Sequence, residues 1–433
     1  MRNRLTQLLS ALVVVSAGAA ADGQAELESA FAAVEPRVIE WRRDLHANPE
    51  LSNREFRTAE KVAAHLRGLG FDEVETGIAH TGVVGTLRGG KPGPVIALRA
   101  DMDGLPVLEQ TGLPFASRAR GEYMGREVPV MHACGHDTHV AMLMGAAEVL
   151  ARNRELLAGT VKFIFQPAEE GAPPGEEGGA ELMVREGVLD GPDAPEAILG
   201  LHVWPDDAGS LGYRSGSFMA AADGIEIKVT GRQTHGSSPW LGVDPIYVSG
   251  QILAALQGIP GRHVDITRGP AVVTIGSIQG GVRGNIIPDD VTMLGTVRTF
   301  DMEERERLLQ RLEATVTGIA EANGASATLT VTGSTPVTGN HPELLQTMMP
   351  TLVRAAGEDR VLERNLSTGA EDFSYYQEKI PGLFLMLGVG DPSVPREERP
   401  SNHSPFFTAQ EDALIVGVRT LVGFALDYPG QRL

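Results

Sequence analysis

The chain has 433 residues, too long for one ordinary hydrophobic core, and its hydrophobic content of 42% is sufficient for two globular domains. The formal net charge of -19 argues against a nucleic-acid partner, because phosphate binding requires clustered Lys and Arg, which occur only near the extreme N-terminus. A single cysteine excludes an intramolecular disulfide framework, so the cellular compartment has to be inferred from the N-terminal segment.

The first residues have the pattern of a secretory signal peptide, expected over 1–21. Arg2 and Arg4 precede an apolar run over 8–21 that ends in small residues. A membrane anchor is the alternative, but the run is shorter than the ~20 apolar residues that a spanning helix needs. We therefore expect cleavage near Ala21 and a protein that is exported, periplasmic or secreted, with no membrane contact after cleavage.

The segment that follows predicts an α/β domain. Residues 27–69 have a helical pattern with a break near Pro49. Short apolar runs then alternate with helical stretches, so that buried strands are expected over 83–87, 95–100, 161–165 and 197–201, and helices over 140–152 and 180–186. This alternation predicts a doubly wound, mostly parallel sheet with helices on both faces.

The pattern changes near Phe218, where apolar and polar residues begin to alternate along the strands. Strands are expected over 225–229, 271–278, 290–298 and 327–331, and helices over 245–256 and 303–323. This composition predicts a smaller α+β domain. Long helices and buried strands resume after Thr335, so the smaller domain is inserted in the larger one. The expected domains are a first part of the catalytic domain over 26–217, an inserted domain over 218–333 and a second catalytic part over 334–433.

The only cysteine, Cys134, lies in the run MHACGHDTH at residues 131–139, among three imidazoles and a carboxylate. A thiolate is a soft ligand and imidazole a borderline one, so the run favours zinc or a similar divalent ion over calcium or magnesium. An apolar helical stretch follows directly, which predicts a loop that ends at a helix N-terminus, where ligands often bind. The alternative is a buried cysteine beside a polar helix start.

Other candidate ligands follow predicted strands or lie in turns. The strand over 161–165 leads into Glu169 and Glu170, at the edge where open α/β sheets bind ligands. His202 follows the strand over 197–201, and His403 lies in a turn-rich stretch near the C-terminus. Ligands spread along the chain are typical of catalytic metal sites. The expected metal ligands are Cys134, His136, Glu170, His202 and His403.

The glutamate pair and Asp101, which lie near these ligands, can each be interpreted in two ways. Adjacent carboxylates are usually only solvated, but beside a metal one can bind the ion while the other accepts a proton from the attacking water. Asp101, at the end of the strand over 95–100, can orient a ligand imidazole. A plain turn acid is the competing interpretation for Asp101.

Five ordered motifs resemble the di-metal aminoacylase/carboxypeptidase-type amidohydrolases, within them the branch of hippurate hydrolase and the indole-acetyl-amino-acid hydrolases. The motifs are RADMDGLP at 99–106, HACGHD at 132–137, QPAEEG at 166–171, GAEDF at 369–373 and NHS at 402–404. The resemblance covers nearly all of the mature chain. It implies two divalent metal ions per subunit, zinc or manganese with nickel or cobalt as further options, held by the five ligands, with Cys134 bridging them.

The resemblance also implies roles for single residues. Glu169 matches the general base and proton shuttle, and Arg99 stands where sister branches have a ligand histidine, for which His136 is expected to compensate. His235 matches a histidine that reaches the partner subunit's site and steadies the oxyanion. Asn285 and Arg298 match lid residues that hold the substrate carboxylate. The inserted domain is accordingly expected to act as a lid and to form a homodimer through 218–333.

The expected function is metal-dependent hydrolysis of the amide bond of N-acyl amino acids or small peptides by a metal-activated water. A carboxypeptidase or dipeptidase of the same family is the nearest alternative. A cysteine hydrolase that uses Cys134 and a non-catalytic periplasmic binding protein are rivals from other classes, although a binder has no need of Glu169. A serine hydrolase is disfavoured because the chain has no Gly-x-Ser-x-Gly elbow. Acetyl, aryl-acyl, indole-acyl and dipeptide substrates are all compatible with the sequence.

Overall fold

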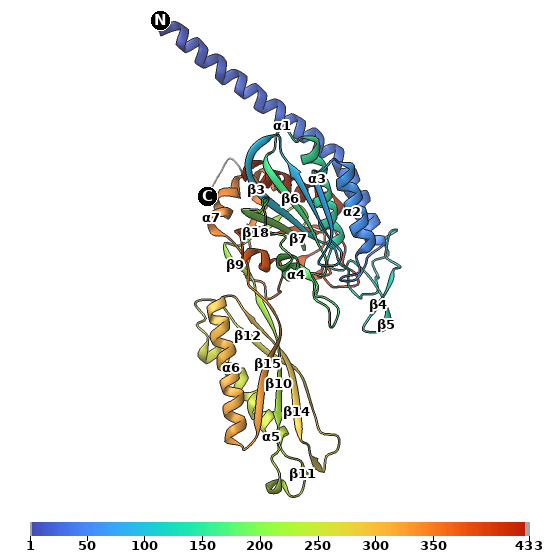
Figure 1. Cartoon of the computed structure of the whole chain (residues 1–433), viewed down its shortest axis with the longest axis vertical. Coiled ribbons are helices and arrows are strands. Elements are labelled where there is room, and N and C mark those ends of the chain that lie inside the picture. The colour runs from blue at the N-terminus through green and yellow to red at the C-terminus, as the bar shows by residue number, and fades with distance from the viewer. Residues whose placement is uncertain (1, 429–433) are drawn as a thin grey trace. The chain divides into compact units, whose positions relative to one another are not determined.

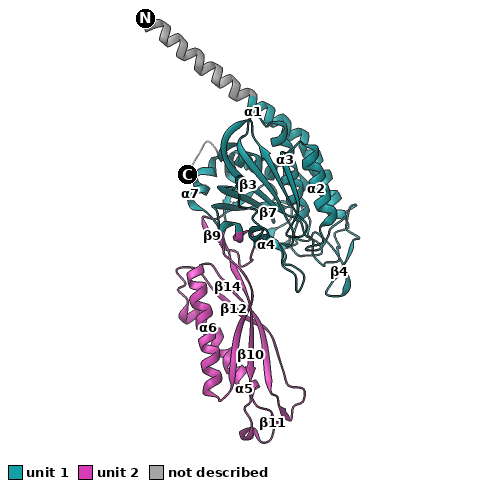
Figure 2. Cartoon of the chain, in the orientation of Figure 1, with its two compact units in different colours: residues 1–213, 340–364, 376–433 teal, residues 214–339, 365–375 magenta. Residues whose placement is uncertain are grey.

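The computed structural model describes the backbone of residues 2–428 and the side chains of residues 23–428. The signal peptide expected over 1–21 lies outside the described side chains. Within the described part of the chain, no helix combines the length and apolar character needed to cross a membrane. The chain forms two compact units (Figure 2): unit 1 is Met1–Tyr213, Asn340–Arg364 and Tyr376–Leu433, and unit 2 is Arg214–Gly339 and Asn365–Tyr375.

Unit 1 is built on an eight-stranded sheet with the order β1-β2-β6-β3-β7-β18-β8-β17. Its central strands β6, β3, β7 and β18 are labelled in Figure 1. Its strands are β1 (Glu73–Ile78), β2 (Gly82–Arg88), β3 (Lys91–Asp101), β6 (Ala158–Gln166), β7 (Ala197–Asp207), β8 (Leu211–Tyr213), β17 (Val361–Glu363) and β18 (Gly382–Gly390). The central pairs β6/β3, β3/β7 and β7/β18 are parallel, whereas β1/β2 and β2/β6 at one edge are antiparallel. The mostly parallel sheet predicted from the sequence is confirmed.

The helices of unit 1 explain why its central strands are largely buried. They are α1 (Arg2–Ala47), α2 (Phe56–Gly68), α3 (His136–Arg152), α4 (Gly179–Arg185), α7 (Pro342–Ala356) and α9 (Leu414–Asp427). The short helix α8 (Ser374–Gln377) contains the point in the chain where unit 2 ends and unit 1 resumes. Helices α1, α3 and α9 pack on one another, and α3 and α9 also pack on the sheet. Strand β18 is buried over its whole length, as expected of a strand that is covered on both faces.

Unit 2 contains a four-stranded antiparallel sheet with the order β12-β14-β10-β15. Its elements are β10 (Ala221–Thr230), η1 (Pro239–Leu241), α5 (Pro245–His263), β11 (Thr234–His235), β12 (Val272–Gly280), β13 (Ile286–Ile287), β14 (Asp290–Thr299), α6 (Met302–Ala322) and β15 (Ser326–Thr335). Buried residues alternate along β10, and its inward face packs on apolar residues of α5 and α6. The unit is therefore a small α+β fold of the kind that the alternating pattern predicted.

The shorter elements are β4 (Arg120–Tyr123), β5 (Arg126–Pro129), β9 (Gly216–Met219), β16 (Thr338–Asn340), η2 (Glu358–Arg360), η3 (Arg396–Glu398) and η4 (Glu411–Ala413). Several expected boundaries differ from the structure, including those of the inserted domain, expected over 218–333, and two of the differences concern the site. The helix expected over 140–152 begins earlier, at His136, because the turn at Gly135 starts it directly. The strand expected over 197–201 continues to Asp207, because β18 pairs alongside it, and His202 therefore lies within β7, opposite Met386.

Candidate metal centre

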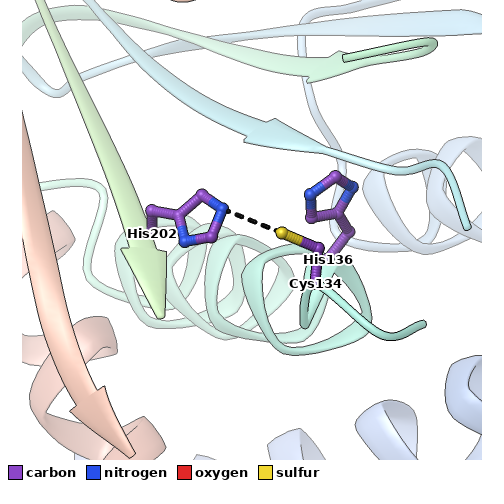
Figure 3. Close-up of side chains that lie close together, drawn as sticks. All are labelled: Cys134, His136 and His202. Atoms are coloured by element: carbon purple, nitrogen blue, oxygen red, sulfur yellow. Dashed lines mark hydrogen bonds between the residues drawn. The ribbon is translucent and has the colours of Figure 1, made fainter. Parts of the chain in front are cut away.

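A glycine turn places Cys134 and His136 at the start of α3. Gly135 has a φ of 89°, and a Cβ atom there would lie 2.4 Å from Cγ2 of Val203. Only glycine fits such a position without strain, because it tolerates the left-handed backbone and the close approach. Figure 3 shows Cys134, His136 and, from β7, His202 gathered around one space, with 3.4 Å between Sγ of Cys134 and Nε2 of His202.

Hydrogen bonds at Nδ1 orient both imidazoles of this group. Nδ1 of His136 donates to Oδ1 of Asp103 at 3.1 Å, and Nδ1 of His202 donates to the carbonyl of Val203 at 2.8 Å. Each ring therefore carries its proton on Nδ1 and has a lone pair on Nε2, the arrangement that metal-binding histidines commonly show. Burial, and then the neighbouring His139, holds the pKa of His202 well below its usual value, so that the ring is neutral at pH 7.

The turn that carries His403 is tied to the loop of Cys134. His403 has a φ of 68°, in the left-handed region that residues other than glycine rarely adopt, and its N–H donates to the carbonyl of Ala133 at 2.8 Å. Asn402 Nδ2 donates to the carbonyls of Cys134 and Val203, at 3.1 Å each. Strained residues persist where the surrounding contacts hold them, often at functional sites. The imidazole is thereby brought to Glu170, with Nε2 of His403 3.0 Å from Oε1 of Glu170.

Asp103 fixes the backbone of the carboxylate pair. The N–H groups of Glu169 and Glu170 donate to its two oxygens at 3.2 and 3.1 Å, and the hydroxyl of Ser52 donates to it at 2.8 Å. Oε2 of Glu169 lies 3.7 Å from Nε2 of His136. One buried aspartate thus holds a ligand imidazole and the glutamate loop in register, a role that the sequence did not reveal.

Asp101 lies at the end of β3, as expected, but it does not bind the imidazole of an expected metal ligand. Its carboxylate is bound by Arg99 at 2.6 Å and by Nδ1 of His139 at 2.5 Å, whereas Nδ1 of His136 is 3.7 Å away. Nε2 of His139 accepts the N–H of Val203 at 2.8 Å. Both nitrogens of His139 are therefore used in hydrogen bonds, and Asp101 and His139 form a supporting network under the ligands. It is Asp103 that accepts the hydrogen bond from His136.

The residues present fit a pair of divalent cations. Donor atoms within 4.8 Å of one another form two groups that share one thiol, Cys134 with His136 and His202, and Cys134 with Glu170 and His403. Nε2 of His136 is buried and has no hydrogen-bond partner among the described residues, a state that is costly unless a cation compensates it. Thiolate, imidazole and carboxylate together suit zinc or another first-row ion.

The electrostatics of Cys134 also favour a ligand over a nucleophile. Burial raises the pKa of the thiol, and the nearby carboxylate of Glu170 raises it further. Reactive cysteines instead lie in electropositive, partly exposed surroundings that lower the pKa. A nearby cation reverses this balance, because it stabilises the thiolate directly.

The three residues expected to contact substrate from the inserted domain all lie in unit 2, at two ends of its sheet. His235 on β11 pairs with Ile286, and the N–H of Gly236 donates to the carbonyl of Asn285 at 2.9 Å. This pair adjoins the end of the β10–β14 ladder where Thr230 faces Asp290, whereas Arg298 faces Ala222 eight residues along β14. At about 3.4 Å per residue the separation is roughly 27 Å. The structure therefore brings His235 and Asn285 together, and keeps Arg298 apart from them.

Known proteins of one family are similar to this chain over most of its length. The family model described as Peptidase family M20/M25/M40 matches residues 97–427. Thermostable carboxypeptidase 2 of Saccharolobus solfataricus is 40% identical over 89% of this chain and 93% of that protein. N-acetylcysteine deacetylase of Bacillus subtilis is 40% identical over 88% of this chain and 93% of that protein.

A solved structure from Bacillus subtilis is similar over the same extent. It is the YXEP protein, described as a dinuclear metal binding peptidase from the M20 family, with a TM-score of 0.77 and 36% identity, covering 93% of this chain and 100% of that one. The resemblance inferred from the five motifs is thereby confirmed. The chain belongs to peptidase family M20/M25/M40 and is a metal-dependent hydrolase of peptide or related amide bonds.

Proposed function

We propose that this protein hydrolyses the amide bond of N-acyl amino acids, or of small peptides, at a site that holds two divalent ions. The observation that carries the proposal is the convergence of four donor side chains around the buried thiol of Cys134, beside a further carboxylate, Glu169. The proposed ligands are Cys134, His136, Glu170, His202 and His403. The names of the relatives, a carboxypeptidase and a deacetylase of an N-acyl amino acid, support this substrate class. They do not support a binding protein without turnover.

The two adjacent carboxylates, Glu169 and Glu170, have different proposed roles. When bound, the cations supply acidification of a water and polarisation of the scissile carbonyl. Glu170 is paired with His403, while Glu169 faces His136 across 3.7 Å. We assign proton transfer to Glu169, which takes a proton from the attacking water and returns it to the leaving amine. Asp103 keeps the backbone of both glutamates in place during this transfer.

Zinc or manganese is the metal that we propose, with nickel or cobalt as further options, because a thiolate among imidazoles favours first-row ions. Chelation followed by dialysis is expected to abolish hydrolysis, and one of these ions is expected to restore it. Elemental analysis is expected to find two equivalents per chain in the wild type and fewer in Cys134→Ser. Hydrolysis that survives chelation would instead indicate a cysteine nucleophile.

The separation within unit 2 supports a homodimer through residues 218–333, which we propose. Because roughly 27 Å along β14 separates Arg298 from His235 and Asn285, one copy cannot place all three on one small substrate. We propose that Arg298 binds the substrate carboxylate and that His235, with Asn285, serves the site of a second copy. Exposed apolar side chains near His235 support such an interface, among them Trp240 at 75% and Val282 at 96% exposure. The same unit then acts as lid and dimerisation domain.

Export is proposed from the pattern of residues 1–21 alone. A positively charged start, an apolar run and small residues up to Ala21 support a cleaved signal peptide and a periplasmic or secreted protein. N-terminal sequencing of the protein from fractionated cells is expected to find a mature chain that begins near Asp22. An intact Met1 in the cytoplasmic fraction would contradict the proposal.

A further inference from the structure

A cavity of about 750 Å³ in unit 1 lies directly beside the proposed ligand Glu170. Its walls come from segments 51–54, 104–106, 122–125 and 170–176, here called the hairpin pocket because the tip of the β4–β5 hairpin forms one side. Ser52 on its wall donates to Asp103, the residue that holds the backbone of Glu169 and Glu170. The pocket and the metal centre therefore share a wall.

We propose that the hairpin pocket is the subsite for the acyl group of the substrate, and that it selects bulky apolar acyl groups, such as aryl-acyl, over acetyl. This inference rests on the proposed amidohydrolase function. When the scissile carbonyl of a substrate lies beside Glu170, the acyl substituent on that carbonyl lies next to this cavity. The volume lies within the range of small-molecule sites. An acetyl group fills only about two to three water volumes, roughly 60–90 Å³.

The charged residues on the walls make the pocket unsuitable for the other end of the substrate, the amino acid with its free carboxylate. Arg54 is the one cation among the described lining residues, and it is paired with Glu176 at 2.6 Å. Glu122 adds a further carboxylate to the lining. Among the described lining residues, a free amino-acid carboxylate would therefore meet no unpaired cation, whereas an uncharged acyl group needs none. The apolar part of the lining, including Leu51 and Leu105, suits such a group.

The hairpin tip gives an independent indication of binding. Met124 and Gly125 form a two-residue turn with φ values of 51° and 71°, the type I′ geometry for which Asn and Gly are the favoured residues. A methionine in this left-handed position is strained, and its side chain is 71% exposed. A flexible thioether held at the rim of an apolar pocket adapts to ligands of different shape. Tyr123 beside it adds an aromatic surface.

Two variants test the proposal from opposite directions. Met124→Asn removes the apolar side chain and relieves the turn, whereas Pro174→Trp fills the pocket. The matched control is Met302→Gln, an exposed methionine in unit 2. Rates are measured with N-benzoyl and N-acetyl derivatives of the same amino acid on metal-loaded protein. A second series keeps the acyl group and varies the amino acid.

The wild type is expected to prefer the benzoyl substrate. Each pocket variant is expected to lower kcat/KM for that substrate about tenfold, mainly through KM, and to leave the acetyl substrate and the control nearly unchanged. Equal losses on both acyl groups, or a wild type that prefers acetyl, would overturn the pocket assignment alone. A change that follows the amino acid instead of the acyl group would also overturn it. Failure to hydrolyse any N-acyl amino acid or peptide would overturn the proposed function, and the pocket assignment with it.

Discussion

At the scale of single residues, the centre depends on side chains that do not themselves bind the ions. Asp103 accepts four hydrogen bonds, from His136, Ser52 and the N–H groups of Glu169 and Glu170. Although burial acts to raise it, hydrogen bonding to His136 lowers the pKa of Asp103, so that it stays an acceptor. A carboxylate is needed there, because an amide nitrogen cannot accept either N–H.

Asp103→Asn is therefore expected to weaken metal binding and activity. Residues that orient metal ligands typically contribute 10–100-fold, so kcat/KM is expected to fall about tenfold or more. Competition titration with a metal indicator is expected to show a weaker affinity in parallel. The control is Asp359→Asn, a substitution at an exposed position. Unchanged metal affinity together with unchanged kcat/KM would show that Asp103 has no positioning role.

A partly buried histidine away from the centre makes stability depend on pH. His65 is packed in α2 with Nε2 donating to the carbonyl of Met144 at 3.1 Å, and burial lowers its pKa to about 4. The folded protein therefore resists protonation that the unfolded chain accepts near pH 6.5, so stability is lost as the pH falls from 6.5 towards 4. The loss amounts to a few kcal/mol, on the order of 2–3, at the acid end of this window.

His65→Gln keeps an N–H donor but does not titrate, so its free energy of unfolding is expected to fall less steeply across this window. Urea unfolding at pH 7 and pH 4.5, followed by circular dichroism, measures the difference between the two proteins. If the two unfolding midpoints shift in parallel, His65 does not cause the pH dependence.

At the scale of elements, the ends of β3, β6 and α3 and the middle of β7 position the ligands. The turn into α3 is tightly constrained, because Gly135 combines a φ of 89° with Val203 and Phe407 in the space that a Cβ atom would need. Any Cβ atom there has to displace one of these side chains or the backbone between Cys134 and His136. The same glycine therefore determines both where α3 begins and how Cys134 and His136 are placed.

Gly135→Ala is expected to destabilise the protein by about 2–4 kcal/mol, the sum of left-handed strain and overpacking. It is also expected to lower the bound metal. Gly318→Ala is the control, since Gly318 lies in α6 with no atom within 4 Å of an added Cβ, and alanine is the better helix former. Thermal unfolding and metal analysis compare both variants with the wild type. A Gly135→Ala protein as stable and as metal-rich as the control would contradict this account.

At the scale of the whole molecule, we propose that the site is complete only when two copies meet. His235 and Asn285 lie at one end of the unit 2 sheet and Arg298 at the other, so in this proposal one chain supplies only part of the substrate contacts. Symmetric dimers commonly exchange such residues between partners. The prediction can be tested without altering the interface itself.

Glu169→Ala and His235→Ala are each expected to be inactive as homodimers. When the two are co-expressed, half of the dimers are mixed, and each mixed dimer has one intact site, so about a quarter of wild-type activity is expected. Light scattering after chromatography checks that the particles are dimers. Activity that stays at the level of the separate variants would place His235 in the site of its own subunit.

The sequence by itself was sufficient to predict the main helices and strands of both units and to propose the ligand side chains. Strand and helix periods are local, so the buried strands and the alternating strands of unit 2 could be recognised from the order of apolar residues. The ligand motif around Cys134 could be recognised for the same reason, because its donors are neighbours in the chain.

Only the tertiary structure decided how these groups act together. The sequence left Asp101 open as either a residue that orients a ligand imidazole or a plain turn acid, but the hydrogen bond from His136 goes to Asp103, two residues on along the same strand end. The hairpin pocket was equally invisible, because its walls come from four segments that meet only on folding. Residue types and local periods are encoded within short windows of sequence. Distances between side chains far apart in the chain are set by strand pairing and by the packing of the helices on the sheet.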